Sequence, residues 1–333
     1  AGVSGFVLFS FHPFHVLSVF AVISASFLVL MIKEKKILWY LVRYYLVFNL
    51  LSTPAILYYF YLLKVDPVWS QKALQNLTFI TPLWITLFSY GLLLVFAVVG
   101  AYLLIKQKNT SAKFIFIISW AAAQFLVLYS PVNFQRRMTE GLHFPLVILT
   151  AVALFFIYSQ IKQQNTALKK FLFSQRYAVL MILVVLFTAS NFFLLAVDGY
   201  IYFSRREMSY IDKSYIEAAE WLKKVPADAI IFNSSRTFVN PVPAYSGRTV
   251  YVGHGVETPF FRQKENEVKW FFNRNRSEDI ELVFLKKRNI DYIFYTPAER
   301  ALGDYQPENK SYLNEVFGNQ AVKIYAVLSS ENL

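Results

Sequence analysis

The sequence predicts a multi-pass α-helical membrane bundle of about six transmembrane helices, followed by a small α/β extracytoplasmic domain with a parallel or mixed sheet. Of the 333 residues, 56% are hydrophobic and 18% aromatic, whereas soluble domains are roughly 45–50% apolar. Residues 1–198 carry 15 Lys and Arg against four acids, and residues 199–333 carry 18 against 17. We therefore expect a membrane domain over 1–198 and a soluble domain over 199–333.

Six apolar segments of the first part are candidate membrane helices, because a hydrocarbon core of about 30 Å takes roughly 20 residues of helix. The second segment is long and contains Pro54, which favours a tilt or kink. The fourth segment is the shortest. The segments are Phe14–Ile32, Ile37–Leu63, Pro82–Ile105, Phe114–Leu128, Phe144–Ile161 and Tyr177–Val197.

The connectors between these segments alternate in charge. Residues 33–36, 106–113 and 162–176 together hold ten Lys and Arg, whereas residues 64–81 and 129–143 hold four. Cytoplasmic loops carry the excess of Lys and Arg, so we expect the first set in the cytoplasm and the second set outside. The sixth helix then delivers residues 199–333 to the outer side of the plasma (inner) membrane.

The second part predicts alternating helices and strands, which favours a parallel or mixed sheet covered by helices. We expect Asn240–Arg248 to be a rigid connecting loop. The expected helices are Tyr215–Lys224, Asn266–Phe272, Glu278–Arg288 and Tyr312–Phe317, and the expected strands are Ala229–Phe232, Thr249–Val252, Ile290–Tyr295 and Ala321–Leu328.

Composition also excludes some classes of protein. The pI near 9.5 does not indicate nucleic-acid binding, because the basic excess lies in short connectors between apolar runs. The absence of cysteine excludes disulfides and Cys-ligated metal. The chain opens at Ala1 within an apolar stretch, so we expect further sequence upstream.

Arg136 and Arg137 are the strongest binding candidates, because they lie in a loop predicted to be outside, where the charge rule does not call for Lys or Arg. Guanidinium groups suit bidentate contact with phosphate. We therefore expect these arginines, with His143, to bind the phosphate of a lipid carrier. The alternatives are contact with ordinary anionic lipid, or a salt bridge to Glu140 or to the soluble domain.

For the other candidate site residues, a structural role explains the sequence at least as well as a catalytic or metal-binding role. Asp66 precedes a proline and is a minor catalytic candidate, since such residues usually form turns. His12 and His15 have a spacing that can share a metal, but Pro13 interrupts that geometry and the sequence shows no third ligand, so we expect no metal there.

In the soluble part, His254 and Glu257 follow an expected strand and form a candidate acid/base pair, because ligands gather at the carboxyl ends of strands. A turn packed on the membrane domain explains them equally well.

A set of stretches carries a family resemblance. They are Pro54–Tyr61, Asp66–Trp69, Gln75-Asn76, Tyr90-Gly91, Gly100, Tyr129–Pro131, Gln135–Arg137, Gly141–His143, Pro145 and Gly247–Thr258. As a set they resemble the later part of bacterial multi-pass glycosyltransferases of the GT-C superfamily, the class that includes protein mannosyltransferases.

The resemblance implies transfer of a sugar from a polyprenyl-phosphate carrier to a glycan or protein acceptor on the extracytoplasmic face, with no other cofactor. Members usually carry a catalytic acidic motif in the first outer loop. Asp66 and Glu140 are the only acids in the outer loops here, so we expect the catalytic loop upstream of Ala1. The alternative is a non-catalytic membrane protein of envelope polysaccharide biogenesis, either a transporter or an assembly or binding factor. Transport predicts charged residues in mid-membrane, and the predicted spans are nearly free of them.

Overall fold

The computed structural model describes residues 1–107, 111–163, 170–171, 174–204, 210–234 and 240–328. The chain divides into two compact units, Ala1–Phe192 and Phe193–Leu333. Each unit has its own clusters of buried hydrophobic side chains.

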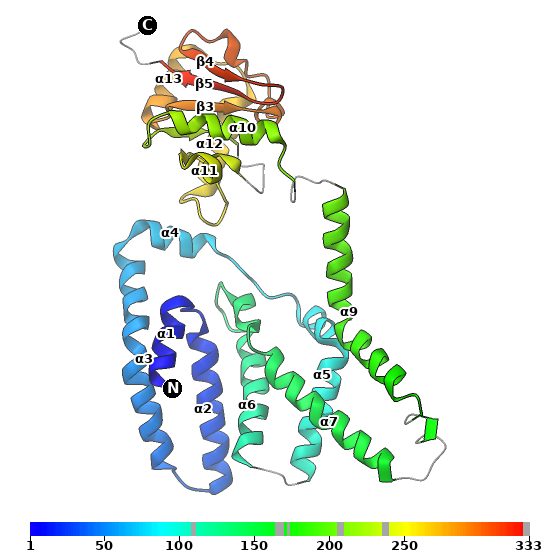
Figure 1. The fold of residues 1–333 in the computed structure, drawn as a ribbon. Coiled ribbons are helices and arrows are strands. Elements are labelled where there is room, and N and C mark those ends of the chain that lie inside the picture. The colour runs from blue at the N-terminus through cyan, green and yellow to red at the C-terminus, as the bar shows by residue number, and fades with distance from the viewer. Residues whose placement is uncertain (108–110, 164–169, 172–173, 205–209, 235–239, 329–333) are drawn as a thin grey trace. The chain divides into compact units, whose positions relative to one another are not determined.

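The first unit is helical, and each of the six predicted segments coincides with a helix (Figure 1). One further apolar helix, α1, opens the chain. The helices are α1 (Gly2–Phe11), α2 (His15–Glu34), α3 (Trp39–Val65), α4 (Pro67–Gln75), α5 (Leu83–Lys106), α6 (Ala112–Val127), η1 (Gln135–Thr139), α7 (His143–Gln163) and α9 (Arg176–Phe203), which runs on into the second unit.

Four of the described helices are long and apolar enough to cross a membrane: α2, α3, α5, and α7 together with η1. The α9 helix is bent by 63° between Thr188 and Ser190 and makes a fifth if its two halves are one span. The α6 helix has only 16 residues. These helices are consistent with the prediction of a multi-pass membrane protein, whereas the count of about six spans is not confirmed.

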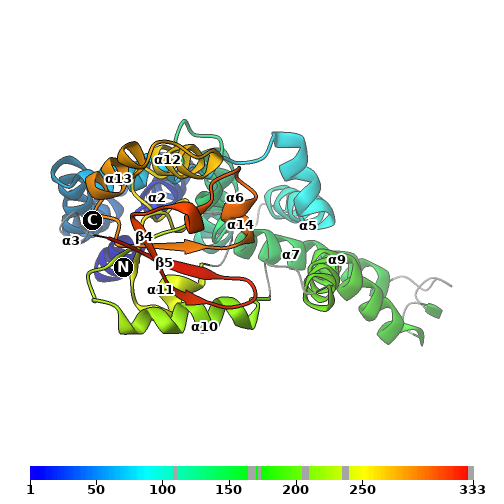
Figure 2. The same cartoon turned by 90° about the horizontal axis from the view of Figure 1, so that it is seen from above.

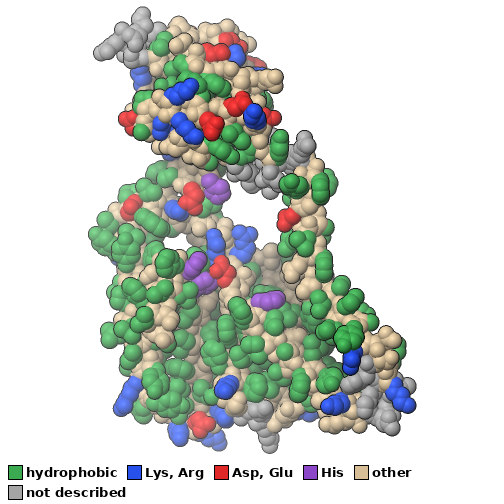
Figure 3. Space-filling view, viewed as in Figure 1, with side chains coloured by type: hydrophobic (Ala, Val, Ile, Leu, Met, Phe, Trp, Pro, Cys, Tyr) green, Lys and Arg blue, Asp and Glu red, His purple; other side chains and the backbone are tan. Residues whose placement is uncertain are grey.

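Large apolar side chains cover the outside of the helical unit, as Figure 3 shows for one face. Leu50, Phe88 and Phe155 expose 76%, 78% and 72% of their surface. An apolar exterior of this extent is unfavourable in water and suits lipid.

Small residues let the helices pack closely. Gly100 of α5 lies against the backbone of α7, where an added Cβ would be 2.0 Å from the carbonyl oxygen of Leu149. Close backbone approach through glycine is a usual device of membrane helices. Two turns before Gly100 along α5, the Leu93 carbonyl accepts from the Thr150 hydroxyl of α7 at 2.9 Å. These contacts join α5 firmly to α7.

The connectors fall at two opposite ends of the helical unit, here called the Lys33 end and the Arg136 end (Figure 1). At the Arg136 end the two long connectors bind each other. The Thr78 N–H donates to the Asn133 carbonyl at 2.8 Å, and the Arg136 N–H donates to the Thr78 carbonyl at 2.8 Å. The Gln135 side chain accepts from the Ile80 N–H at 3.2 Å. The loop that carries the arginines is thus fastened to residues 77–81.

The second unit is built on a five-stranded mixed sheet with the order β2-β1-β3-β5-β4. The strands β2, β1 and β3 are parallel, and β5 is antiparallel to both β3 and β4. The strands are β1 (Ile230–Phe232), β2 (Thr249–Val250), β3 (Tyr292–Tyr295), β4 (Leu313–Gly318) and β5 (Lys323–Val327), and the helices are α10 (Lys213–Trp221), η2 (Leu222–Lys224), α11 (Pro241–Ser246), α12 (Phe261–Asn273), α13 (Glu278–Lys287), α14 (Pro297–Arg300) and η3 (Pro307–Asn309).

Helices cover both faces of this sheet (Figure 2). Phe232, Ile293 and Tyr295 point to the face covered by α12 and α13, where Phe271 and Leu285 are buried. Their strand neighbours, such as Ile231 and Phe294, point to the face covered by α10 and α11. Alternation along each strand therefore builds a three-layer core.

Two sequence predictions for this unit are wrong. Tyr312–Phe317 is not a helix, because Leu313–Gly318 forms the edge strand β4 on β5. Asn240–Arg248 is not a loop throughout, since Pro241–Ser246 forms the short helix α11. The Asn240 side chain caps α11 by accepting from the Val242 N–H at 3.1 Å, and Gly247 ends it at φ 71°.

Candidate functional site

Arg136 and Arg137 lie on η1, a single 3-10 turn at the Arg136 end, and both side chains are exposed. Nη1 of Arg137 is 3.9 Å from Oε1 of Glu140, and its guanidinium lies over the Phe14 ring at 5.5 Å. The ion pairs found among the described residues do not include Arg136. The salt bridge to Glu140 that the sequence allowed is therefore formed by Arg137, and Arg136 presents its charge to the surroundings.

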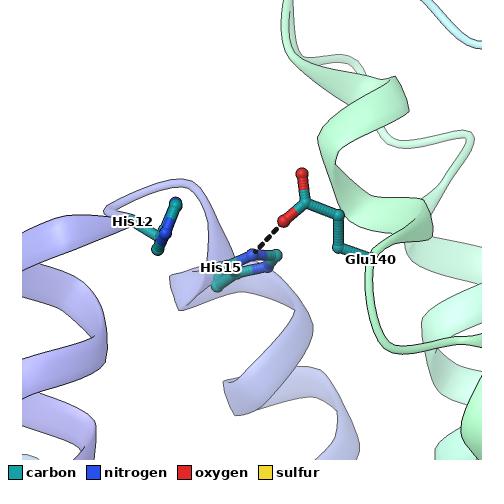
Figure 4. Close-up of side chains that lie close together, drawn as sticks. All are labelled: His12, His15 and Glu140. Atoms are coloured by element: carbon teal, nitrogen blue, oxygen red, sulfur yellow. Dashed lines mark hydrogen bonds and ion pairs between the residues drawn. The ribbon is translucent and has the colours of Figure 1, made fainter.

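Glu140 also contacts the N-terminal helices. Its Oε2 is 2.9 Å from Nε2 of His15, at the start of α2 (Figure 4). His12 lies beside His15, with ring centroids 5.8 Å apart. The prediction that the two histidines have no third potential ligand nearby is wrong, because Glu140 comes from a loop 125 residues later.

A buried amide holds the loop that carries Glu140. Gln124 of α6 exposes 2% of its surface. Its Nε2 donates to the carbonyls of Met138 at 2.8 Å and Glu140 at 2.6 Å, and its Oε1 accepts from the Trp120 indole at 2.6 Å. Gln124 is not among the residues that the sequence predicts for this site, although a lone amide within an apolar helix is a usable signal.

An apolar cavity of about 420 Å³ opens beside these groups. Apolar side chains of α1, α2 and α6 form most of its wall, and His15, Ser18, Gln124 and Glu140 are its polar members. The Arg136 end therefore combines cationic groups, a carboxylate and a hydrocarbon-lined hollow.

The remaining candidates of the helical unit lie at the same end. Asp66 caps α4, because its Oδ1 accepts from the N–H groups of Val68 at 2.8 Å and Trp69 at 3.4 Å. This is the structural role expected of an Asp before proline. His143 is exposed and begins α7, three residues after Glu140.

His254 and Glu257 belong to the second unit, in a turn after β2. The His254 carbonyl accepts from the N–H groups of Glu257 and Thr258 at 3.1 and 2.9 Å, and its Nδ1 accepts from the Val256 N–H at 3.3 Å. Both side chains are exposed. The two residues thus lie in a turn, whereas packing of this turn on the membrane domain and an acid/base role for the pair both stay predictions.

Neither a protein-family model nor a curated protein sequence matches the chain. Among solved structures, it is similar to the Archaeoglobus fulgidus oligosaccharyltransferase tethered with an acceptor peptide containing the NVT sequon, at 15% identity and a TM-score of 0.41, covering 74% of this chain and 33% of that chain. It is also similar to the archaeal oligosaccharyltransferase AglB from Archaeoglobus fulgidus in complex with an inhibitory peptide and a dolichol-phosphate, at 15% identity and a TM-score of 0.42, covering 75% and 34%. The apo form of the Archaeoglobus fulgidus oligosaccharyltransferase gives 16% identity and a TM-score of 0.38, covering 67% and 29%. The chain thus spans about a third of the length of these proteins, and a likeness at this level does not identify a family.

Proposed function

We propose that this chain is part of a membrane glycosyltransferase, and that its Arg136 end binds a polyprenyl-phosphate carrier whose sugar is transferred to an extracytoplasmic glycan or protein acceptor. The observation that carries the proposal is the combination of exposed arginines with an apolar cavity. A lipid phosphate is itself anionic at one end and hydrocarbon at the other. The sequence resemblance to GT-C glycosyltransferases supports the same reaction class.

The arginines suit the phosphate part of the carrier. A guanidinium offers planar, paired N–H donors that match phosphate oxygens. When the sugar leaves, negative charge develops on the phosphate, and fixed cations nearby stabilise that charge. We assign Arg136 the direct contact, because Arg137 is already paired with Glu140. His143 is assigned a supporting contact from the start of α7.

The cavity suits the hydrocarbon part. Its wall is mostly apolar, and its polar members include Glu140, which also contacts Arg137. Isoprenoid chain entering this space would leave its phosphate near η1. Burial of apolar chain contributes roughly 0.8 kcal/mol per CH₂ group, so a few carbons add usefully to the phosphate contact.

The catalytic base is not assigned to this end. Asp66 is used in capping α4, and Glu140 bonds to His15. The transport alternative finds no support among the described residues of the helical unit, whose buried polar side chains are Ser, Thr and Gln without a charged group. Transport sites usually hold charged groups in mid-membrane.

The test is equilibrium binding of polyprenyl phosphate to the full chain in detergent micelles. We expect the double substitution Arg136→Gln and Arg137→Gln to weaken binding at least tenfold, since two charge-assisted contacts are removed. Binding of the corresponding polyprenol, which lacks phosphate, is expected to be weak in both proteins.

The matched control is Lys35→Gln with Lys36→Gln, which makes the same change of charge at the Lys33 end. It should bind as the unsubstituted protein does. Equal binding by the arginine double variant, or an equal loss in the lysine control, contradicts the proposal. An equal loss of binding to phosphatidylglycerol vesicles would mean that the arginines contact ordinary anionic lipid.

A further inference from the structure

We propose that His12, His15 and Glu140 bind one divalent transition-metal ion, and that the ion is Zn²⁺. One ligand atom from each residue can be chosen so that all three lie within 4.8 Å of one another. The site joins the turn between α1 and α2 to the loop that carries η1. Figure 4 shows the three side chains gathered at this point.

The turn between α1 and α2 brings the two histidines together. His12 directly follows α1 as its C-cap, and the His15 N–H donates to the His12 carbonyl at 3.1 Å. Pro13 lies inside this turn and does not separate the rings, whose centroids are 5.8 Å apart. The turn between α1 and α2 therefore brings His12 and His15 together, although the two residues do not share a helix face.

The third ligand is held by its surroundings. Gln124 fixes the backbone of Met138 and Glu140 through two hydrogen bonds from a buried position. Arg137 is 3.9 Å from the carboxylate oxygen that does not contact His15. Ligands oriented by outer hydrogen bonds lose less freedom on binding a metal.

The distances require little movement. Zn²⁺ binds imidazole nitrogen and carboxylate oxygen at about 2.0–2.2 Å, so tetrahedral ligand atoms lie about 3.4 Å apart. Nε2 of His15 and Oε2 of Glu140 are already 2.9 Å apart. All three ligand atoms lie within 4.8 Å of one another, so no pair has to close by more than about 1.4 Å, a shift that rotation of the exposed His12 ring can supply.

The donor set selects the class of metal. Two imidazoles and one carboxylate favour Zn²⁺ and its first-row neighbours, whereas Mg²⁺ and Ca²⁺ prefer oxygen ligands alone. Three protein ligands leave a fourth tetrahedral position for water. A simple ion pair explains His15 and Glu140 but gives His12 no role, whereas a metal uses all three.

The experiment is zinc binding to the full chain, purified in detergent with an affinity tag that contains no histidine. The protein is treated with a chelator, dialysed and titrated with Zn²⁺ against a chromophoric zinc chelator. We expect one Zn²⁺ per chain. We also expect His12→Ala and Glu140→Gln each to weaken zinc binding at least tenfold, with unchanged helical content by circular dichroism.

The chain has four histidines and no cysteine, so the two histidines outside the proposed site serve as controls for zinc binding elsewhere. His143→Ala removes an exposed histidine three residues from Glu140, and His254→Ala removes the one in the second unit. Both should bind zinc as the unsubstituted chain does. X-ray absorption at the zinc edge should show two imidazole nitrogens at about 2.0–2.1 Å.

Three results overturn the proposal: less than stoichiometric zinc at micromolar concentration, unchanged affinity in His12→Ala, or an equal loss in His143→Ala. Because His12 is exposed, its substitution tests the site even if a change at His15 prevents folding. No lipid enters this measurement, so its failure is distinct from failure of the lipid-binding test.

Discussion

Single charged residues differ widely in how much they contribute to the stability of the fold, as two Lys–Glu pairs of the second unit illustrate. Nζ of Lys310 is 2.8 Å from Oε2 of Glu281, and these side chains are 6% and 0% exposed. Glu281 also accepts from the Tyr312 hydroxyl and the Arg276 N–H, each at 2.7 Å. The pair of Lys323 and Glu315 has a similar distance, 3.1 Å, but both side chains are about 40% exposed.

We predict that Lys310→Met lowers the free energy of unfolding by about 3–5 kcal/mol, because it leaves a buried carboxylate without its cation. Lys323→Met removes the same charge from an exposed pair and should cost less than about 1 kcal/mol. Denaturant titration of both variants checks the difference. Equal losses of unfolding free energy in the two variants would mean that burial of the Glu281 carboxylate does not make its pairing with Lys310 more important for stability.

At the scale of elements, the close contact of α5 with α7 depends on one missing side chain. A Cβ on Gly100 would meet the carbonyl carbon of Leu149 at 2.8 Å and its oxygen at 2.0 Å, which are backbone atoms that cannot rotate away. The helices must then separate.

We predict that Gly100→Ala destabilises the helical unit by about 1–3 kcal/mol, the usual cost of forcing extra volume into a packed contact. Gly199→Ala is the matched control, since a Cβ there has nothing within 4 Å. Unfolding in mixed detergent micelles measures both. A Gly100→Ala protein as stable as the control would refute the close packing of α5 on α7.

The buried tyrosines of the sheet unit predict how it responds to alkali. Burial is the main cause that raises the pKa of Tyr305 and of Tyr312 well above the usual value, and hydrogen bonding to Glu281 adds to the shift of Tyr312. Their contribution to stability is complete below the unfolded pKa of about 10 and is lost as pH rises above it. The unfolded chain then releases protons that the folded chain keeps.

We therefore expect the free energy of unfolding to fall above about pH 10 by roughly 1.4 kcal/mol per pH unit for each such tyrosine. Tyrosinate absorbance and near-ultraviolet circular dichroism should change together in one cooperative step. Ionisation of all tyrosines near pH 10 with the folded signal retained would contradict this.

The local sequence predicts which segments form helices better than it predicts which segments pair with one another. The six apolar segments coincide with helices because composition and length alone define such segments. The local sequence of Tyr312–Phe317 predicts a short helix, but pairing with β5 decides its state, with a bulge between Glu315 and Phe317. The α11 helix had its signals in the sequence: an Asn cap, a following proline and a glycine after its end.

The candidate site followed the same rule. The arginines were found because their charge departs from the topology pattern within a single loop. The contact of His15 with Glu140 was not found, because it joins residues 125 positions apart and depends on how α2 packs with α6 and η1. Periodicity and propensity carry no information about such a pairing.

At the scale of the whole molecule, the charge pattern predicts that the Arg136 end of the helical unit faces outside and the Lys33 end faces the cytoplasm. Because the chain lacks cysteine, single cysteines can be introduced and labelled from outside. We predict that Ala73→Cys and Asp228→Cys react with a membrane-impermeant maleimide in intact cells. Lys36→Cys should react only after the cells are permeabilised, since the basic connectors are expected in the cytoplasm.

These three positions are exposed, so failure to label reports on sidedness and not on burial. Labelling of Ala73→Cys but not Asp228→Cys in intact cells would mean that an odd number of crossings separates them, whereas the expected topology has an even number, and would put the second unit in the cytoplasm. Expression of each variant is compared by immunoblot.

The hydrogen bonds across the Arg136 end also set an order of events during biosynthesis. A ribosome that adds about 5–20 residues per second needs roughly 6–25 s to go from His15 to Glu140. After residues 77–81 are made, they have no bonding partner until Asn133 and Gln135 follow near the end of that interval, and Gln124 likewise precedes the loop that it holds. The nascent chain must therefore deliver α5 and α6 before this surface acquires its shape, so the surface cannot form from the first helices alone.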